Sequence, residues 1–176
     1  YSVPAMARDI DAVVTALDWP ECIVVGHSMG GRLSSWFAAE YAHKVKKLVL
    51  VDYSPETAPE GTQRVAAVVG NQPDSFESVD DAMRYFGVDP ETAAGHAKRA
   101  RYEAYLRPAG GKFQVKRDLH FRDQFRKIAQ GAEVPKRGVD MWEVLGRVEC
   151  PVLVLRGTRS DMFAATTVPK VRAKIR

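Results

Sequence analysis

A serine flanked by glycines stands where a short apolar run changes into a helical pattern. The residues Gly26-His27-Ser28-Met29-Gly30 match the pattern G-x-S-x-G, and Gly31 follows them. In a sharp strand-to-helix turn this serine takes a strained backbone conformation that lifts its hydroxyl clear of the sheet edge. We expect the glycines two positions before and after it to let the strand and helix backbones approach closely. A Gly-Ser turn without chemistry is the alternative, but the surrounding pattern favours Ser28 as a nucleophile.

Attack by a serine hydroxyl needs a base, a carboxylate that orients the base, and donors for the oxyanion. The backbone N–H of Met29, at the start of the helix, is expected to be one oxyanion donor. The order of such a triad along the chain is serine, acid, histidine. Asp161 follows a later apolar run and is the expected acid, although a loop aspartate that caps the next helix would look the same. Asp52, which ends the apolar run after the helix, is the alternative acid; otherwise it is a turn residue.

No histidine occurs where this order requires one. Four histidines are present, all before Asp161: His27, His43, His96 and His120. His27 adjoins Ser28 in a tight turn and cannot fold back onto it, and His43 falls at the far end of the following helix. The other two stand among charged residues, where solvation explains them. We therefore expect the base histidine to lie beyond Arg176.

The spacing of apolar residues predicts the helices and strands that position these side chains. Residues 6–17 carry apolar side chains on one helical face, and Ser2 can cap that helix. Residues 32–41 form a second helical pattern. Three short runs are apolar at every position: 22–25, 48–51 and 152–155. Strands of this kind, alternating with helices, predict an α/β fold with a mostly parallel sheet and helices on both faces.

The segment from residue 53 to residue 147 has a different character. Amphipathic helical patterns run through residues 79–86 and from Asp89, as a cap, to Leu106. Phe113 and Val115 alternate with polar residues, which indicates a short strand or a loop. A last helix or turn is expected at residues 139–148. The predicted organisation is therefore an α/β core at 1–52 and 148–176, interrupted by a helical insertion at 53–147.

Charge, hydropathy and cysteine content indicate which binding partners and which cellular compartment to expect. The net charge of +4 reflects Lys170, Arg172, Lys174 and Arg176, which a solvated helix face explains, so we expect no nucleic-acid partner. No apolar run is long enough to span a bilayer, and no membrane partner is expected. Cys22 and Cys150 precede strands that a third strand should separate, which is too far for a disulfide. Free thiols favour a reducing compartment, the cytoplasm.

Three stretches of this sequence resemble the α/β-hydrolase superfamily, in its capped esterase, lactonase and acyl-hydrolase branch. They are Gly26–Gly31, Lys47–Asp52, and Pro151–Gly157 ahead of Ser160-Asp161. The resemblance implies an eight-stranded sheet in which this chain supplies the fifth, sixth and seventh strands. The first four strands and the last would be missing, so we expect an internal fragment of a longer protein. It also implies that residues 53–147 form a cap over the active site, with Ser28 as nucleophile, Asp161 as acid and Met29 as oxyanion donor.

The same resemblance indicates the reaction. A serine nucleophile implies attack on the carbonyl of a small acyl substrate, a carboxylic ester, thioester or lactone, through an acyl-enzyme, with no metal or organic cofactor. The alternatives are a non-catalytic ligand-binding protein on this scaffold, and a lyase or carbon–carbon bond hydrolase. Without the base, the fragment alone is expected to be almost inactive. The oligomeric state is not predicted. Six aromatic residues of the insertion are candidates for an acyl pocket, although core packing explains most of them: Phe86, Tyr102, Tyr105, Phe121, Phe125 and Trp142.

Overall fold

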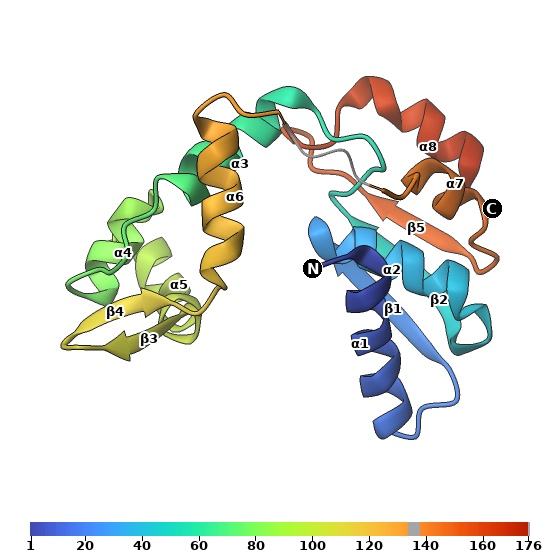
Figure 1. Ribbon diagram of the computed structural model, residues 1–176, viewed down its shortest axis with the longest axis horizontal. Coiled ribbons are helices and arrows are strands. Elements are labelled where there is room, and N and C mark those ends of the chain that lie inside the picture. Colours follow the sequence, from blue (N-terminus) through green and yellow to red (C-terminus); the bar gives the residue numbers. More distant parts are fainter. Residues whose placement is uncertain (134–137, 176) are drawn as a thin grey trace. The chain divides into compact units, whose positions relative to one another are not determined.

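The computed structural model describes residues 1–133 and 138–175, which form two compact units (Figure 1). Unit 1 takes its described residues from 1–62 and 135–176, and unit 2 from 63–134. Arg176, one of the basic residues noted above, lies outside the described residues. Unit 2 falls inside the segment 53–147 but is shorter than it. Both flanks of that segment belong to unit 1, because Tyr53, Met141 and Val144 are buried in the core of unit 1.

Unit 1 is built on a parallel sheet of three strands. They are β1 (Cys22–His27), β2 (Val45–Val51) and β5 (Val152–Leu155), in the order β1-β2-β5. Gly26 pairs with Leu50, and Leu50 pairs with Val154, so the carboxyl ends of all three strands lie at one edge. The α/β class is thus confirmed, and each predicted apolar run is one of these strands.

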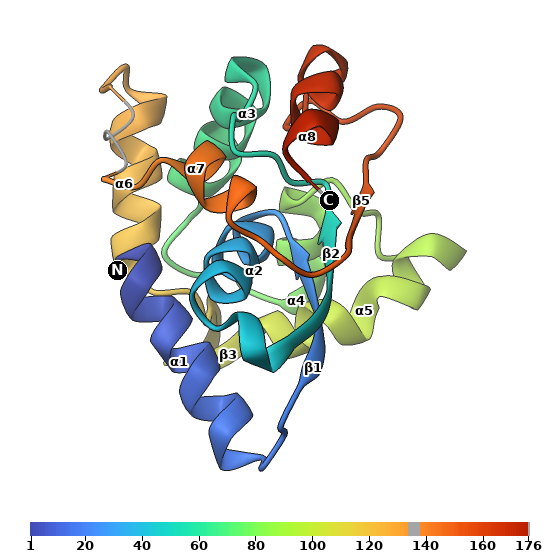
Figure 2. The ribbon, with the colours of Figure 1, turned by 90° about the vertical axis from the view of Figure 1, so that its right-hand side faces the viewer.

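Helices cover one face of this sheet (Figure 2). They are α1 (Val3–Ala16), α2 (Met29–Glu40) and α7 (Met141–Gly146). Ser2 caps α1 as expected, because its Oγ accepts a hydrogen bond from the N–H of Ala5 at 3.3 Å. Leu48 and Leu50 of β2 are fully buried in the core on this side of the sheet. The remaining short helices of unit 1 are η1 (Ala42–Lys44), η2 (Ala165–Thr167) and α8 (Val168–Lys174), and α8 contacts α7.

The opposite face of the sheet presents apolar side chains to solvent. The exposed fractions are 57% for Ile23, 65% for Val25, 54% for Leu153 and 47% for Leu155. We expected helices on both faces, whereas the described residues of unit 1 supply them on one. The difference has a simple cause: an apolar run shows that a strand is suited to burial on both faces, but it does not show which segment provides the cover.

Unit 2 combines helices with a β-hairpin. Its elements are the end of α3 (Pro59–Gly70), α4 (Val79–Tyr85), α5 (Ala93–Tyr105), β3 (Leu106–Ala109), β4 (Lys112–Val115) and α6 (Leu119–Ala129). The antiparallel strands β3 and β4 are joined through Gly110 and Gly111, whose φ values of 59° and 78° are those that a tight hairpin turn requires. The alternation of Phe113 and Val115 therefore marks a strand rather than a loop.

The predicted cap at Asp89 is wrong. The helix α5 begins at Ala93, and its cap is Thr92, whose Oγ1 accepts from the N–H of Gly95 at 3.0 Å. Asp89 instead accepts from the N–H of Glu91 at 3.0 Å, within a turn that precedes the helix. An aspartate before a proline suits a turn as well as a helix start, so the sequence pattern alone does not separate the two.

Four of the six aromatic candidates for an acyl pocket pack against a core or against one another. Phe86 and Tyr105 pack against the core of unit 2, and Phe86 also stacks on Tyr102 with ring centroids 5.9 Å apart. Trp142 lies in α7 and packs against the core of unit 1. Core packing thus explains the aromatic residues near Phe86, as we expected for most of the set.

The two cysteines are free thiols, as predicted. Cys22 begins β1 and Cys150 precedes β5, with β2 between these strands. Burial raises the pKa of both thiols above its ordinary value. None of the helices in the described part of the chain has the length and apolar character needed to cross a bilayer.

Candidate active site

Ser28 is the single residue between the end of β1 and the start of α2. Its φ of 53° and ψ of −118° place it in a region that residues other than glycine rarely adopt, so the predicted strained turn is present. The N–H of Ser28 donates to the carbonyl of Val51 at 3.1 Å, which fixes the turn to the end of β2. The side chain of Ser28 does not cap α2. Its hydroxyl is thus held at the carboxyl edge of the sheet without a structural hydrogen bond to α2.

Two glycines relieve crowding around this turn: Gly26 lies between β1 and α2, and Gly31, which is not the glycine we expected, lies between α2 and Tyr53. A Cβ added at Gly26 would lie 2.5 Å from the carbonyl oxygen of Gly30, and one added at Gly31 would lie 2.6 Å from Cβ of Tyr53. At Gly30 a Cβ would meet no described atom within 4 Å. The prediction is confirmed for Gly26 and wrong for Gly30, because it is the carbonyl of Gly30, not its Cα, that faces the strand.

The first turn of α2 contains a backbone N–H group, that of Met29, from which no helical carbonyl accepts. The first carbonyl available, that of Ser28, accepts instead from the N–H of Gly31 at 2.9 Å and from that of Arg32 at 3.3 Å. Met29, which precedes both, is at the first position of the helix, where an N–H has no intrahelical partner. The helix dipole adds positive potential at this point. The geometry therefore suits an anionic oxygen beside Ser28.

Asp161 lies in a loop that begins at the carboxyl end of β5 and is held by its own side chains. The guanidinium of Arg156 donates to the carbonyl of Phe163 at 2.7 Å and to that of Ser160 at 3.3 Å. The Oγ of Ser160 accepts from the N–H groups of Met162 and Phe163 at 3.3 and 3.0 Å. Phe163 is buried in the core of unit 1. These contacts close the loop around Asp161.

The segment before α3 packs against the same loop. The N–H of Ala58 donates to the carbonyl of Met162 at 2.9 Å. Gly61 faces the loop so closely that a Cβ there would lie 2.3 Å from the carbonyl oxygen of Asp161. A side chain at Gly61 would therefore displace the backbone that carries the predicted acid.

Asp52, the alternative acid, connects β2 to the start of the Asp161 loop. Its N–H donates to the carbonyl of Leu155 at 2.7 Å, and its Oδ1 accepts from the N–H of Gly157 at 3.4 Å. Its φ of 49° is again in the left-handed region. Ser28 and Asp52 thus lie at the ends of neighbouring strands. The structure brings Asp161 to the same edge through a loop that is hydrogen-bonded to Asp52.

The histidines of unit 1 differ in their relation to this edge. His27 is the last residue of β1 and its side chain is exposed. His43 is in η1, which precedes β2, and therefore lies at the opposite edge of the sheet. His96 and His120 belong to unit 2. Among residues 1–133 and 138–175, no three His, Cys, Asp or Glu side chains are grouped as metal ligands would be.

Three residues of this site were not singled out by the sequence pattern: Arg156, Gly61 and Tyr53. Arg156 acts through backbone carbonyls, which carry no sequence signal. Gly61 and Tyr53 matter because they contact residues that are distant in sequence. Only Gly61 could have been noticed in the sequence, as a glycine at the start of a helix, but the sequence did not indicate which residues would lie against it.

Comparisons with known proteins agree on one family. A sequence model for the family described as alpha/beta hydrolase fold matches residues 1–175. The chain is 28% identical over 181 residues to the 3-hydroxybutyrate-oligomer hydrolase of Cupriavidus necator, an alignment that covers 99% of this chain and 61% of that protein. It is 32% identical over 108 residues to the 2-hydroxy-6-oxo-2,4-heptadienoate hydrolase of Pseudomonas putida, which covers 61% of this chain and 38% of that protein.

A solved structure shares the fold over nearly the whole chain. The crystal structure of E-2-(acetamidomethylene)succinate hydrolase superposes with a TM-score of 0.78 at 25% sequence identity, covering 98% of this chain and 62% of that one. The chain therefore spans less than two thirds of the length of this protein and of the Cupriavidus hydrolase.

Proposed function

The chain belongs to the α/β hydrolase fold family, and we propose that the protein is a serine hydrolase that forms an acyl-enzyme on Ser28. The observation that carries this proposal is the backbone of Ser28. A positive φ at the single residue between β1 and α2 holds its hydroxyl at the carboxyl edge of the sheet, where α/β folds bind their ligands. Carboxylic esters, thioesters and lactones are the proposed substrates.

In the proposed reaction the Oγ of Ser28 attacks the carbonyl carbon and its proton passes to a base. The oxygen of the tetrahedral intermediate accepts a hydrogen bond from the N–H of Met29. The leaving group departs with the proton, and water then attacks the acyl group, releasing the acid and restoring the hydroxyl. We propose Asp161 as the residue that orients the base, with Asp52 as the alternative. We propose that the base is a histidine other than His27, which ends β1 at this edge but adjoins Ser28 in the turn and cannot fold back onto it.

The names of the related hydrolases suggest a narrower substrate class. A hydroxybutyrate oligomer, a heptadienoate and a succinate derivative each contain a carboxylate. We propose that the substrate of this protein is likewise a carboxylate-bearing acyl compound. A second candidate is cleavage of a carbon–carbon bond next to a ketone, because the heptadienoate in that name contains a 6-oxo group and no ester.

The test uses the complete gene product and its Ser28→Ala variant. Hydrolysis of short p-nitrophenyl acyl esters should fall about 10⁴-fold or more on loss of the nucleophile. A serine-directed phosphonate should label wild type and not the variant, with the adduct on the peptide that contains Ser28. Equal rates together with absent labelling would replace this proposal by the non-catalytic ligand-binding alternative.

A matched pair of variants separates the two acids. Asp161→Asn should lower kcat about 10⁴-fold if Asp161 orients the base, as the loss of a triad acid does elsewhere. Asp52→Asn keeps an oxygen that can accept from the N–H of Gly157 and should change kcat by less than about tenfold. The reverse ranking would assign the acid to Asp52.

A further inference from the structure

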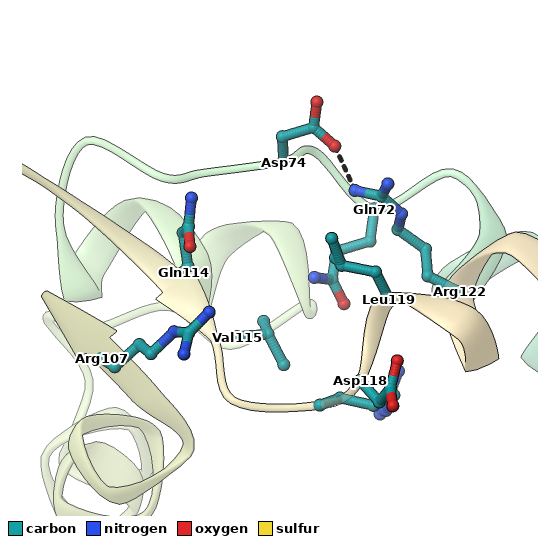
Figure 3. Close-up of a pocket in the computed structure, with 9 residues that line it drawn as sticks. Gln72, Asp74, Arg107, Gln114, Val115, Asp118, Leu119 and Arg122 are labelled. Carbon is teal, nitrogen blue, oxygen red and sulfur yellow. Dashed lines mark hydrogen bonds and ion pairs between the residues drawn. The ribbon is translucent and has the colours of Figure 1, made fainter. Parts of the chain in front are cut away.

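Unit 2 contains a pocket of its own, far in sequence from Ser28. Its volume is about 290 Å³, and its walls come from the hairpin β3–β4, the start of α6 and the segment after α3 (Figure 3). Three of the side chains that line it are arginines: Arg107, Arg117 and Arg122. A buried cation needs a counter-charge or hydrogen-bond acceptors, whereas an exposed one such as Arg107 is solvated, so the burial and the partners of each arginine decide what the pocket can hold.

Arg122 is the arginine with carboxylate partners inside the protein. Its side chain is 11% exposed and forms an ion pair with Asp74 (Figure 3), and its Nη2 lies 3.4 Å from Oδ1 of Asp123. Asp118, the other acidic residue of the lining, caps α6 by accepting from the N–H of His120 at 2.8 Å. The charge of Arg122 is therefore compensated by acidic residues of unit 2.

Arg117 contacts a neutral side chain, that of Tyr105, in two ways. Its Nη2 donates to the hydroxyl of Tyr105 at 2.5 Å, and its guanidinium carbon lies 5.6 Å from the centre of the same ring. Burial raises the pKa of Tyr105, so the phenol is uncharged at neutral pH and cannot neutralise the guanidinium. The Nη1 of Arg117 is buried and has no hydrogen-bond partner in the described part of the chain. A buried charged donor left in this state is rare in folded proteins and favours a ligand that can accept from it.

Arg107 lies on β3, and its side chain has no hydrogen bond or ion pair with any described residue. Its side chain lies beside that of Gln114 in Figure 3. The other side chains of the lining include the amides of Gln72 and Gln114 and the apolar groups of Val115 and Leu119. The pocket thus offers the guanidinium of Arg107, the buried Nη1 of Arg117 that has no hydrogen-bond partner in the described part of the chain, polar amides, and a short apolar wall.

We propose that this pocket binds a small organic carboxylate. Arg107 and Arg117 hold the carboxylate, as guanidinium groups do with planar anions, while Val115 and Leu119 contact its short apolar body. A volume of about 290 Å³ suits a molecule of a few carbon atoms. The proposal goes beyond the hydrolase reaction, since it depends only on residues of unit 2 and makes no use of Ser28.

The experiment measures binding of succinate, of its neutral diamide succinamide, and of inorganic phosphate to the complete gene product, by calorimetry and by NMR. Succinate should bind at least tenfold more tightly than succinamide, and its affinity should fall about tenfold or more in Arg107→Gln and in Arg117→Gln. Arg84→Gln is the matched control, because it removes one exposed positive charge from unit 2 outside the pocket. It should leave the affinity within twofold of wild type.

Each contrary outcome has a separate meaning. Equal binding of succinate and succinamide, or an equal loss in Arg84→Gln, would overturn the pocket as a carboxylate site. Tighter binding of phosphate than of succinate at the same residues would replace the carboxylate by an inorganic anion. If Arg117→Gln fails to fold, Arg107→Gln decides the result, because Arg107 makes no polar contact that its loss would break. Binding in Ser28→Ala should equal wild type, so failure here and failure of the hydrolase proposal are distinguishable.

Discussion

Replacing Gly26 by alanine tests the strand-to-helix turn on which the proposed site depends. The added Cβ would lie 2.4 Å from the Oγ of Ser34 and 2.5 Å from the carbonyl oxygen of Gly30. The Ser34 side chain can rotate away, but it then loses its hydrogen bond to the carbonyl of Gly30 at 2.7 Å. That carbonyl belongs to the backbone of α2 and cannot move alone. The substitution must therefore push β1 and α2 apart.

The expected loss follows from these two contacts. Overpacking of a tight core costs about 1–3 kcal/mol, and contact with a backbone atom places this site near the upper end. Loss of the Ser34 hydrogen bond adds about 1 kcal/mol. A total of about 3–4 kcal/mol corresponds to a Tm about 6–16 °C lower for a protein of this size class.

Gly30→Ala is the matched control, since a Cβ there would meet no described atom within 4 Å. Gly30 lies in the first turn of α2, where alanine is favoured over glycine by up to about 1 kcal/mol, so its Tm should be unchanged or higher. Thermal and urea unfolding of the complete gene product would measure both variants. If Gly26→Ala and Gly30→Ala unfolded at the same temperature, the close approach of strand and helix at Ser28 would be refuted.

Three further predictions concern the acid loop and the buried titratable groups. Arg156→Met removes two hydrogen bonds from a charged donor to the Asp161 loop, each worth about 1.5–3 kcal/mol. The variant should lower kcat for ester hydrolysis more than tenfold with little change in KM. A change in KM alone would contradict a positioning role for Arg156. Burial raises the pKa of Cys22 and Cys150, so iodoacetamide at pH 8 should alkylate both thiols more slowly than it alkylates free cysteine. Alkylation rates are measured by mass spectrometry, and rates equal to that of free cysteine would show that the thiols are solvated. The pKa of Tyr105 is raised by burial, so its contribution to the free energy of unfolding is fully present below its unfolded-state pKa of about 10 and declines as the pH rises toward the folded-state value. Urea unfolding at pH 9 and pH 11 should therefore show a larger loss in wild type than in Tyr105→Phe, and equal losses would argue against a buried phenol.

The sequence predicted the central part of unit 1 well because its signals are local. The apolar runs at 22–25, 48–51 and 152–155 are all strands, and the turn at Ser28 has the predicted backbone. Each of these features is determined by residues next to one another in the chain. The catalytic roles of Ser28, Met29 and Asp161 remain predictions, since they need a base and a substrate.

The features that the sequence did not predict depend on contacts between distant residues. The crowding at Gly31 requires Tyr53, and the limits of unit 2 depend on which side chains join the core of unit 1. The choice of Thr92 over Asp89 as a helix cap was also missed, because both residue types suit both positions. Arg156 could not be identified, since its partners are carbonyl oxygens of its own loop.

The end of β2 is a shared anchor for both halves of the proposed machinery. The carbonyl of Val51 holds the amide of Ser28, while the next residue, Asp52, holds Leu155 through its amide and Gly157 through its carboxylate. A substitution that displaces the end of β2 is therefore expected to disturb the turn at Ser28 and the loop that carries Asp161 at the same time.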